Sequence, residues 1–400
     1  MTDTKDVTIR VVSSMDDIPP ADWDRLSNPT SSPSIEYDYN PFNTHAFFDA
    51  LEKSGSANRN TGWLGQHLVM EHQFEGASQI TGVLPCFLKN HSQGEYVFDH
   101  GWADAFERAG GNYYPKLQAT TPFTPATGRR LLVGNDDNSA KRRLLLAGGL
   151  QQVCEQLEVS SVHVTFLPED EWDALGQANY LQRTDQQFHW LNDGYENFDQ
   201  FLSVLSSRKR KNIKKERATA LKDNGITIEH LTGMDLTEDI WDTFYRFYMD
   251  TGSRKWGQPY LTREFYSRIG ETMADDVLLV MAKRDGRYIA GAINFIGSHT
   301  LFGRHWGCVE DHPCLHFEVC YYQAIEFAIA NKLSRVEAGA QGGHKLARGY
   351  MPQITHSAHY ITHPDFRRAV SDYLEQERKA VHRENEAIAR HGPFKKGNDS

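Results

Sequence analysis

The sequence has no long hydrophobic run and few cysteines. No apolar stretch approaches the roughly 18 residues that a membrane-spanning helix requires, and residues 1–10 are polar, without the apolar core of a signal peptide. The five cysteines are odd in number and include no Cys-x-x-Cys pair, which favours a reducing compartment without structural disulfides. We therefore expect a cytoplasmic protein that has no membrane partner.

An excess of positive charge is also missing. The net charge of −10 argues against general binding of nucleic acid, so any anion-binding role must be local. Cysteine and histidine gather at 308–320, yet their spacings match no pattern of zinc ligands, and we expect no metal site there. The 400 residues, 39% hydrophobic and 24% charged, suit a soluble globular chain with two domains of about 150–200 residues each.

The sequence does contain an alternation of β and α patterns, which is clearest in its second half. Aliphatic and β-branched runs predict strands, and Asp285-Gly286 predicts a hairpin turn between two of them. Apolar residues at i, i+3, i+4 and i+7 predict a helix from Phe317 to Asn331. The predicted order is an antiparallel meander, this helix and a short strand, with the strands at 277–282, 288–296, 300–306 and 336–338.

The first half repeats this order without obvious sequence identity. It predicts strands at 67–72, 80–89 and 96–99, a helix around 103–108 and a small-residue loop at 122–130. We interpret the chain as a duplicated α/β unit with a boundary near 185–197. The predicted domains are 1–190 and 191–365, followed by a charged helix and tail at 366–400.

The most informative stretch follows the short strand at 336–338. A turn rich in glycine opens directly onto side chains that can move protons or hold negative charge. Glycines at such a junction allow close approach of a ligand and leave amide groups available for oxyanions. The alternative is a loop that only turns the chain. The glycines are Gly339, Gly342 and Gly343, and the polar residues are His344, Lys345, Arg348 and Tyr350.

A second unusual stretch is strongly basic. Seven of the ten residues from Arg208 to Arg217 are Lys or Arg, in a chain that is acidic overall. Apolar residues before and after this stretch continue a helical pattern that ends at Asn224-Gly225. The basic run is either a solvated helix face or a grip for a polyanion, such as a coenzyme diphosphate or the acceptor end of a tRNA.

Five strings of residues carry a resemblance, at 94–99, 113–117, 122–125, 207–213 and 337–350. Together they resemble a bacterial family of predicted N-acyltransferases that is labelled a peptidoglycan biosynthesis or recognition protein. This family is a distant relative of the Fem aminoacyltransferases, which carry two GNAT-type (GCN5-related N-acetyltransferase) units in one chain. The resemblance implies an α/β fold of two tandem GNAT-like units, each a mixed, mainly antiparallel sheet flanked by helices.

The resemblance also implies the reaction. An acyl or aminoacyl group would move from an activated donor, either acyl-CoA or aminoacyl-tRNA, to an amine acceptor, with no bound cofactor. The stretch 309–316 departs from the acyl-CoA pattern, because it has no glycine and carries two acids where a GNAT unit holds the CoA diphosphate. A non-catalytic alternative remains open, in which the cleft between the units recognises a cell-wall precursor or peptide.

Amide formation needs a base for the amine and an acid for the leaving group. We expect His344 to act as the base, because imidazole titrates near neutral pH. Glu337 would orient His344 or accept its proton through water, and Tyr350 or Tyr322 would be the acid.

Further residues are candidates for binding substrate or donor. The amides of Gly342 and Gly343, with Lys345 and Arg348, would hold a carboxylate or phosphate. Arg304 either binds ligand or packs in the sheet. The counterparts in the first unit would be Lys116, Arg129 and Arg130, and Lys211 and Lys215 would contact a tRNA donor.

Overall fold

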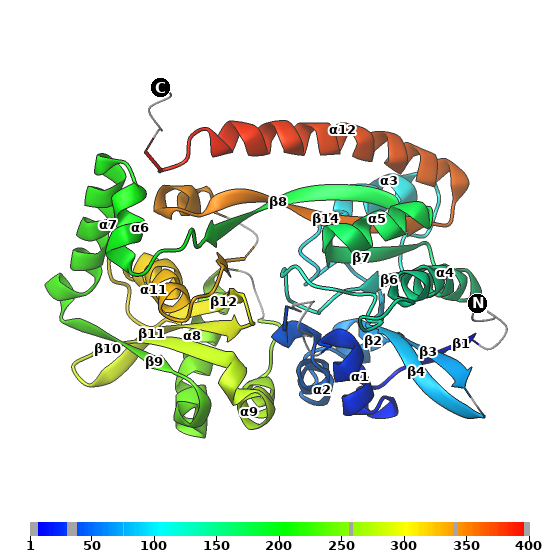
Figure 1. Cartoon of the computed structure of the whole chain (residues 1–400), viewed down its shortest axis with the longest axis horizontal. Helices are drawn as coiled ribbons and strands as arrows, with labels where there is room; N and C mark the ends of the chain where they lie inside the picture. Colours follow the sequence, from blue (N-terminus) through cyan, green and yellow to red (C-terminus); the bar gives the residue numbers. More distant parts are fainter. Residues whose placement is uncertain (1–6, 30–37, 75, 256–258, 340–341, 396–400) are drawn as a thin grey trace. The chain divides into compact units, whose positions relative to one another are not determined.

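The computed structural model describes residues 7–29, 38–74, 76–255, 259–339 and 342–395 (Figure 1). The chain divides into two compact units. The first unit comprises Met1–Asp185 and Ile354–His382, and the second comprises Gln186–Gln353 and Arg383–Ser400. This division differs from the predicted domains after residue 353, because the chain leaves the second unit and returns to pair with a strand of the first.

The first unit contains two groups of strands. A three-stranded antiparallel sheet has the order β1-β3-β4, and five further strands follow the order β2-β5-β6-β7-β14. Only β6 and β7 of these neighbours are parallel. The strands are β1 (Val7–Val12), β2 (Trp63–Gly65), β3 (His67–Phe74), β4 (Ala77–Leu84), β5 (Phe87–Lys89), β6 (Lys116–Ala119), β7 (Ser161–Leu167) and β14 (Met351–Ile361).

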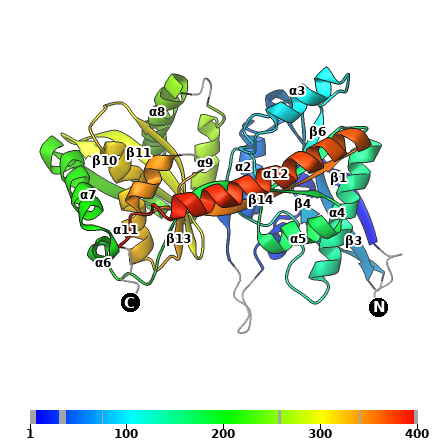
Figure 2. The ribbon, with the colours of Figure 1, turned by 90° about the horizontal axis from the view of Figure 1, so that it is seen from above.

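Helices cover these strands and bury their apolar side chains. All seven residues of β7 are buried, as expected for a central strand rich in β-branched residues. Val370 and Leu374 of α12 pack with Trp102 of α3, so the C-terminal helix completes a core of this unit. The helices are α1 (Pro20–Ser27), α2 (His45–Lys53), α3 (His100–Arg108), α4 (Ser139–Gln156), α5 (Glu169–Gln177) and α12 (Pro364–Ala389), which is unbroken (Figure 2).

The strand predicted at 96–99 is wrong. Tyr96 has a φ angle of 60°, in the left-handed region, and this interrupts extended backbone. Glu95 and Asp99 are buried instead, where both form ion pairs with Lys116. The pairing that the prediction gave to 96–99 belongs to β6, which is antiparallel to β5.

The second unit confirms the predicted meander, helix and strand. Its sheet has the order β8-β13-β12-β11-β10-β9. Asp285 and Gly286 form the predicted hairpin turn, with φ angles of 49° and 75° that suit this pair of residues. The strands are β8 (Leu181–Leu191), β9 (Ile226–Leu231), β10 (Val277–Arg284), β11 (Arg287–Ile296), β12 (Thr300–Cys308) and β13 (Arg335–Glu337).

Helices lie on both faces of this sheet. Ala290 and Ala292 of β11 belong to the core that includes the π-helix η8 and α11, whereas Gly291 between them faces Phe244 of α8. The helices are α6 (Phe198–Val204), α7 (Ser207–Ala220), α8 (Glu238–Lys255), α9 (Arg263–Thr272), α10 (Leu315–Phe317), η8 (Glu318–Tyr322), α11 (Gln323–Ala330) and the 3-10 helix η9 (Gly343–Arg348).

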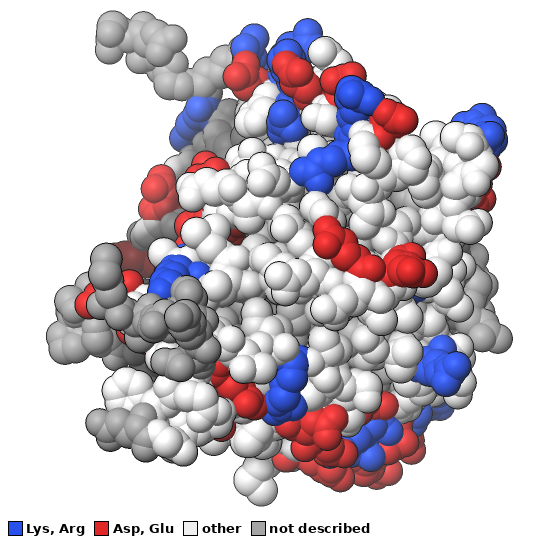
Figure 3. Space-filling model, turned by 90° about the vertical axis from the view of Figure 1, so that its right-hand side faces the viewer, with Lys and Arg blue, Asp and Glu red and all other residues white. Residues whose placement is uncertain are grey.

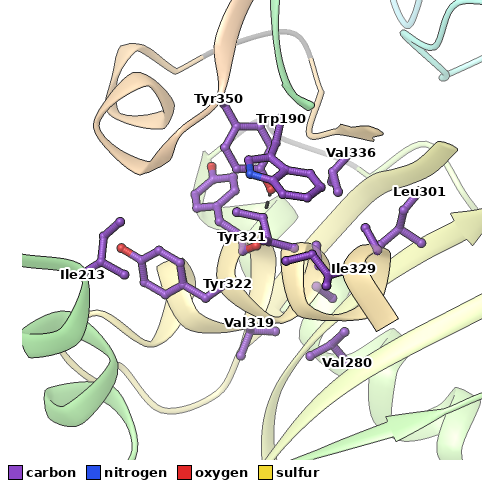
Figure 4. Close-up of a cluster of buried hydrophobic side chains, with 14 of the residues drawn as sticks. Trp190, Ile213, Val280, Leu301, Val319, Tyr321, Tyr322, Ile329, Val336 and Tyr350 are labelled. Carbon is purple, nitrogen blue, oxygen red and sulfur yellow. Dashed lines mark hydrogen bonds between the residues drawn. The ribbon is translucent and has the colours of Figure 1, made fainter. Parts of the chain in front are cut away.

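The core of the second unit fixes η8 against the sheet (Figure 4). Val319 and Tyr322 are fully buried there, together with Leu301 and Val336, which are paired residues of β12 and β13. Tyr350 caps this cluster and donates a hydrogen bond to the backbone oxygen of Tyr321 (3.4 Å). The η8 helix is therefore held rigidly beside the strands that build the site.

No helix among the described residues is long and apolar enough to cross a membrane. The face shown in Figure 3 carries scattered Lys and Arg side chains, interspersed with Asp and Glu. No continuous basic patch appears among the described residues of that face, in agreement with the net charge of −10.

Candidate active site

The site in the second unit begins where two parallel strands part. β12 pairs with β13 through Thr300, Leu301 and Phe302 only, while β12 itself continues to Cys308. At the same point β12 is bulged, because Ala292 lies opposite Trp306 but Asn294 lies opposite Gly303. Bulges re-aim side chains and are frequent beside active sites. Beyond Phe302, the edge of β12 that pairs with β13 therefore borders an opening, while its other edge stays paired with β11.

A cavity of about 80 Å³ occupies this opening. It has room for a few waters or for one small polar group. None of the side chains that line it is a carboxylate, whereas one is a guanidinium and two are imidazoles. The lining residues are Ala292, Ile293 and Asn294 of β11, Gly303, Arg304, His305 and Trp306 of β12, and His316, Cys320, Tyr321 and Ala338.

The cationic side of the cavity comes from the bulge. Arg304 and His305 lie within it, and His305 packs against the ring of Tyr248, with centroids 4.9 Å apart. Burial and the neighbouring charge of Arg304 lower the pKa of His305 to about 3, so its imidazole is neutral. Arg304 thus supplies a positive charge to the cavity, and its role in binding a ligand stays a prediction.

The opposite wall is the π-helix η8. Such a turn inserts an extra residue into a helix and is frequent at functional sites. Here Cys320 and Tyr321 line the cavity, while Tyr322, next along the chain, reaches Glu216 of α7 and donates a hydrogen bond to it. Burial raises the pKa of Tyr321 far above its ordinary value, so its hydroxyl remains protonated.

His344 lies beside the cavity, at the start of η9. Its side chain is exposed, and its Nε2 atom is 2.9 Å from the Tyr321 hydroxyl. His316 is a further neighbour, with ring centroids 6.2 Å apart. A protonated phenol next to an imidazole can donate to a neutral ring nitrogen and receive the proton back. The structure therefore brings the predicted base together with Tyr321, which is a wall of the cavity.

Gly342 is required for this placement. Its φ angle is 126°, and a Cβ atom added there would lie 2.7 Å from the imidazole of His344. The predicted need for glycine in the turn thus has a steric cause at this position. Gly343 is the first residue of η9. Residues 340–341 lie outside the described residues.

The predicted cations of the loop contact the protein itself. Lys345 is buried and donates to the backbone oxygens of Ala338 (2.5 Å) and Gly339 (2.8 Å), and burial lowers its pKa to about 8. Arg348 donates to the backbone oxygen of His344 (2.7 Å) and to both carboxylate oxygens of Glu216 (2.9 and 3.0 Å). Both side chains hold the loop in place, and a role in binding a substrate anion stays a prediction.

Glu337 and Tyr350 lie deeper than the sequence suggested. Glu337 is buried at the end of β13, opposite His189 of β8, and its carboxylate is 3.9 Å from Arg335. Tyr350 is fully buried in the core and is absent from the lining of the cavity. Tyr322 instead donates to Glu216, and the phenol that lines the cavity is that of Tyr321, whose role in the site was not predicted.

The candidates in the first unit contact groups of the protein itself. Lys116 is fully buried and donates to Glu95 (2.7 Å) and to Asp99. Arg129 is partly exposed and pairs with Asp170 (2.9 Å). Arg130 is buried and donates to backbone oxygens, including that of Ala126 (3.0 Å). A site in the cleft between the two units stays a prediction.

The basic stretch forms α7 as predicted. Arg217 anchors it, pairing with the buried Glu318 (2.9 Å) and with Glu326 (2.7 Å). Lys211 and Lys215 are exposed, as are Arg208 and Lys214. The helix therefore has an anchored face and an exposed basic face. Among the described residues no group of His, Cys, Asp or Glu is placed to hold a metal ion.

These features describe a two-unit α/β protein in which one unit carries a small polar cavity beside a phenol–imidazole pair. The chain belongs to the FemAB-like family, described as peptidoglycan biosynthesis/recognition, whose model matches residues 14–396. This confirms the predicted relation to the Fem proteins. No curated protein matches the chain in sequence.

The solved structures similar to this chain are distant in sequence. A crystal structure of FemX is 11% identical over 80% of this chain and 93% of that chain, with a TM-score of 0.49. L-PGS from Bacillus licheniformis is 8% identical over 84% of this chain and 98% of that chain, with a TM-score of 0.45. A tandem GNAT protein from the clavulanic acid biosynthesis pathway is 12% identical over 89% and 98%, with a TM-score of 0.44.

Proposed function

We propose that this chain transfers an acyl or aminoacyl group from an activated donor to an amine acceptor in peptidoglycan metabolism. Membership of the FemAB-like family supports the process. The observation that carries the reaction is the hydrogen bond of 2.9 Å between Tyr321 and His344 at the edge of a polar cavity.

Tyr321 and His344 supply the proton path that amide formation needs. The amine attacks the carbonyl carbon of the donor, forming the C–N bond, and its proton passes to the Tyr321 oxygen as the phenolic proton moves to His344 Nε2. As the ester or thioester bond breaks, the path reverses and the leaving oxygen or sulfur receives the proton. Arg304 lies in the cavity wall, where a cation stabilises the oxyanion that forms between these steps.

Two observations favour aminoacyl-tRNA over acyl-CoA as the donor. The exposed face of α7 presents Arg208, Lys211 and Lys215, which suits a long phosphate backbone. The stretch 309–316, between β12 and η8, contains no glycine to cradle a coenzyme diphosphate. The acceptor would be an amine of a cell-wall precursor or peptide.

The test supplies the purified chain with radiolabelled aminoacyl-tRNA or radiolabelled acetyl-CoA, each with a peptidoglycan precursor that carries an amine. We expect label to move from the tRNA to the precursor, and not from acetyl-CoA. The test variant is Tyr321→Phe, which alters the cavity, and its matched control is Tyr288→Phe, which does not. Transfer from acetyl-CoA alone would overturn the donor assignment, and no transfer from either donor would overturn the reaction.

A non-catalytic recognition protein is the second candidate. The same absence of a glycine turn at 309–316 favours it, because a protein that only binds needs no coenzyme. It predicts saturable binding of the precursor with no transfer, unaffected by Tyr321→Phe. Calorimetry with the precursor, run beside the transfer assay, separates the two candidates. An enzyme transfers label as wild type and loses transfer but not binding in Tyr321→Phe, whereas a recognition protein binds in both forms and transfers in neither.

A further inference from the structure

One ion pair connects the basic helix α7 to the loop that carries His344. Arg348 of η9 bridges them, with Nη2 2.9 and 3.0 Å from the two oxygens of Glu216 and Nη1 2.7 Å from the backbone oxygen of His344. Only 7% of the Arg348 side chain is exposed, so solvent screens this contact weakly. The bridge thus joins a residue of α7 to the backbone of the proposed base.

The same carboxylate also contacts the residue next to Tyr321, the other member of the proton path. Tyr322 donates a hydrogen bond to Glu216, and Tyr322 is adjacent in the chain to Tyr321. The Arg348 guanidinium lies over the ring of Phe317, 3.4 Å from its centroid, and Phe317 directly precedes η8. Glu216 therefore contacts both elements whose side chains meet in the hydrogen bond between Tyr321 and His344.

Anchoring of α7 does not account for Glu216. The next residue, Arg217, already fixes this helix through Glu318 and Glu326, and Ile213 is buried in the core. Glu216 is moreover the single acid among residues 208–217. A carboxylate within a basic stretch weakens the attraction of that stretch for a polyanion, so its presence there calls for a separate role.

We propose that Glu216 is a positioning residue, which holds His344 and Tyr321 in register through Arg348 and Tyr322. It also ties the helix that faces the donor to the reacting pair, an inference that rests on the proposed function. Because a misplacement of about 1 Å costs on the order of 100-fold in rate, loss of Glu216 lowers kcat while the donor still binds through the exposed lysines.

The test compares Glu216→Gln with Glu326→Gln, which removes an equivalent partner from Arg217 but leaves Arg348 untouched. We expect Glu216→Gln to lower kcat between about 10- and 100-fold with little change in the KM for aminoacyl-tRNA. Glu326→Gln leaves kcat within about twofold, as expected for an ion pair that only anchors the helix. Equal losses in both variants would mean that Glu216 anchors the helix, and would overturn the proposal.

A second readout needs no substrate. In protein labelled selectively at His and Tyr, the nuclear Overhauser contact between the rings of His344 and Tyr321 is expected in wild type and in Glu326→Gln, and is lost in Glu216→Gln. A contact that persists in Glu216→Gln would refute the positioning role even if the proposed reaction fails. Conversely, if the wild type keeps the contact, Glu216→Gln loses it and the wild type shows no transfer activity, only the proposed function is contradicted.

If Glu216→Gln does not fold, Arg348→Lys replaces it. Lysine keeps the charge but cannot donate to Glu216 and to the His344 backbone as the guanidinium fork does. We expect the same fall in kcat. Where Glu216→Gln does fold, its combination with Arg348→Lys should be no worse than either change alone. Additive losses would show that the two residues act independently, which the proposal forbids.

Discussion

Lys116 offers a sharp test of how the first unit is held together. Its ammonium group is fully buried and donates to Glu95 (2.7 Å), Asp99 and Ser92 (2.8 Å). Burial lowers the pKa of Lys116, but the charges of Glu95 and Asp99 outweigh this and raise it overall, so the group stays charged. Asp99 also accepts a hydrogen bond from Tyr113 (2.6 Å).

Replacing Lys116 with Met fills the same space but leaves two carboxylates buried without this cation. Lys89 remains 3.6 Å from Glu95 and cannot serve both acids. Removing one partner of a buried ion pair costs about 3–5 kcal/mol. For a unit of this size, that loss lowers Tm by about 6–20 °C.

Urea denaturation of the whole protein measures the free energy of unfolding, and calorimetry in a separate experiment measures Tm. Lys53→Met is the matched control, because Lys53 also contacts two acids, Asp16 (3.0 Å) and Asp49 (2.8 Å), but on the surface. Solvent screening limits that loss to about 0–1 kcal/mol. Equal losses in Lys116→Met and Lys53→Met would refute the conclusion that the cluster around Lys116 is desolvated.

Three further predictions follow from single features. Burial, followed by the charge of Lys116, lowers the pKa of His163 to about 3, so unfolding takes up a proton below pH 6.5 and the free energy of unfolding falls as the pH drops from 6.5 towards 3. In His163→Gln, the fall in the free energy of unfolding between pH 7 and 5.5, measured in urea, should be smaller by about 1 kcal/mol. An unchanged slope would contradict this. Lys211→Glu with Lys215→Glu should raise the Kd for tRNA and reduce its salt dependence in gel shifts, whereas identical binding would remove the donor role of α7. Gly342→Ala should lower kcat, because its Cβ would displace the nearby imidazole, and should also lower Tm, because a φ angle of 126° is strained for alanine; full activity would show that the ring position is unimportant.

The sequence predicted the local architecture of the second unit well. The strands from β10 to β12, the helix after them and the turn at Asp285-Gly286 depend on short-range patterns, and the structure has each of them. The first unit was harder, because the segment 96–99 has apolar and aromatic residues of a strand but a left-handed backbone at Tyr96. Glu95 and Asp99, on either side of Tyr96, are buried and form ion pairs with Lys116, and no local sequence pattern reveals these contacts.

The site was predicted only in part, because it too depends on contacts that no local sequence pattern reveals. The glycine turn and His344 were evident from composition, whereas the partner of His344 was not, because Tyr321 obeys the apolar periodicity of its helix. Lys345 and Arg348 were expected to bind anions, yet their nearest contacts are the backbone of their own loop and Glu216. The contact between Arg348 and Glu216 joins residues 132 positions apart and depends on the folded chain.

In the proposed reaction, Tyr321 and His344 carry the proton. The most direct measurement is the single-turnover rate of transfer from aminoacyl-tRNA to an amine for wild type, Tyr321→Phe, His344→Ala and the control Tyr288→Phe. General acid–base catalysis contributes about 10²–10⁴-fold, so we expect losses of that size for the first two variants, unchanged tRNA binding, and a normal rate for the control. Rates within about threefold of wild type for both Tyr321→Phe and His344→Ala would contradict this role of the two residues.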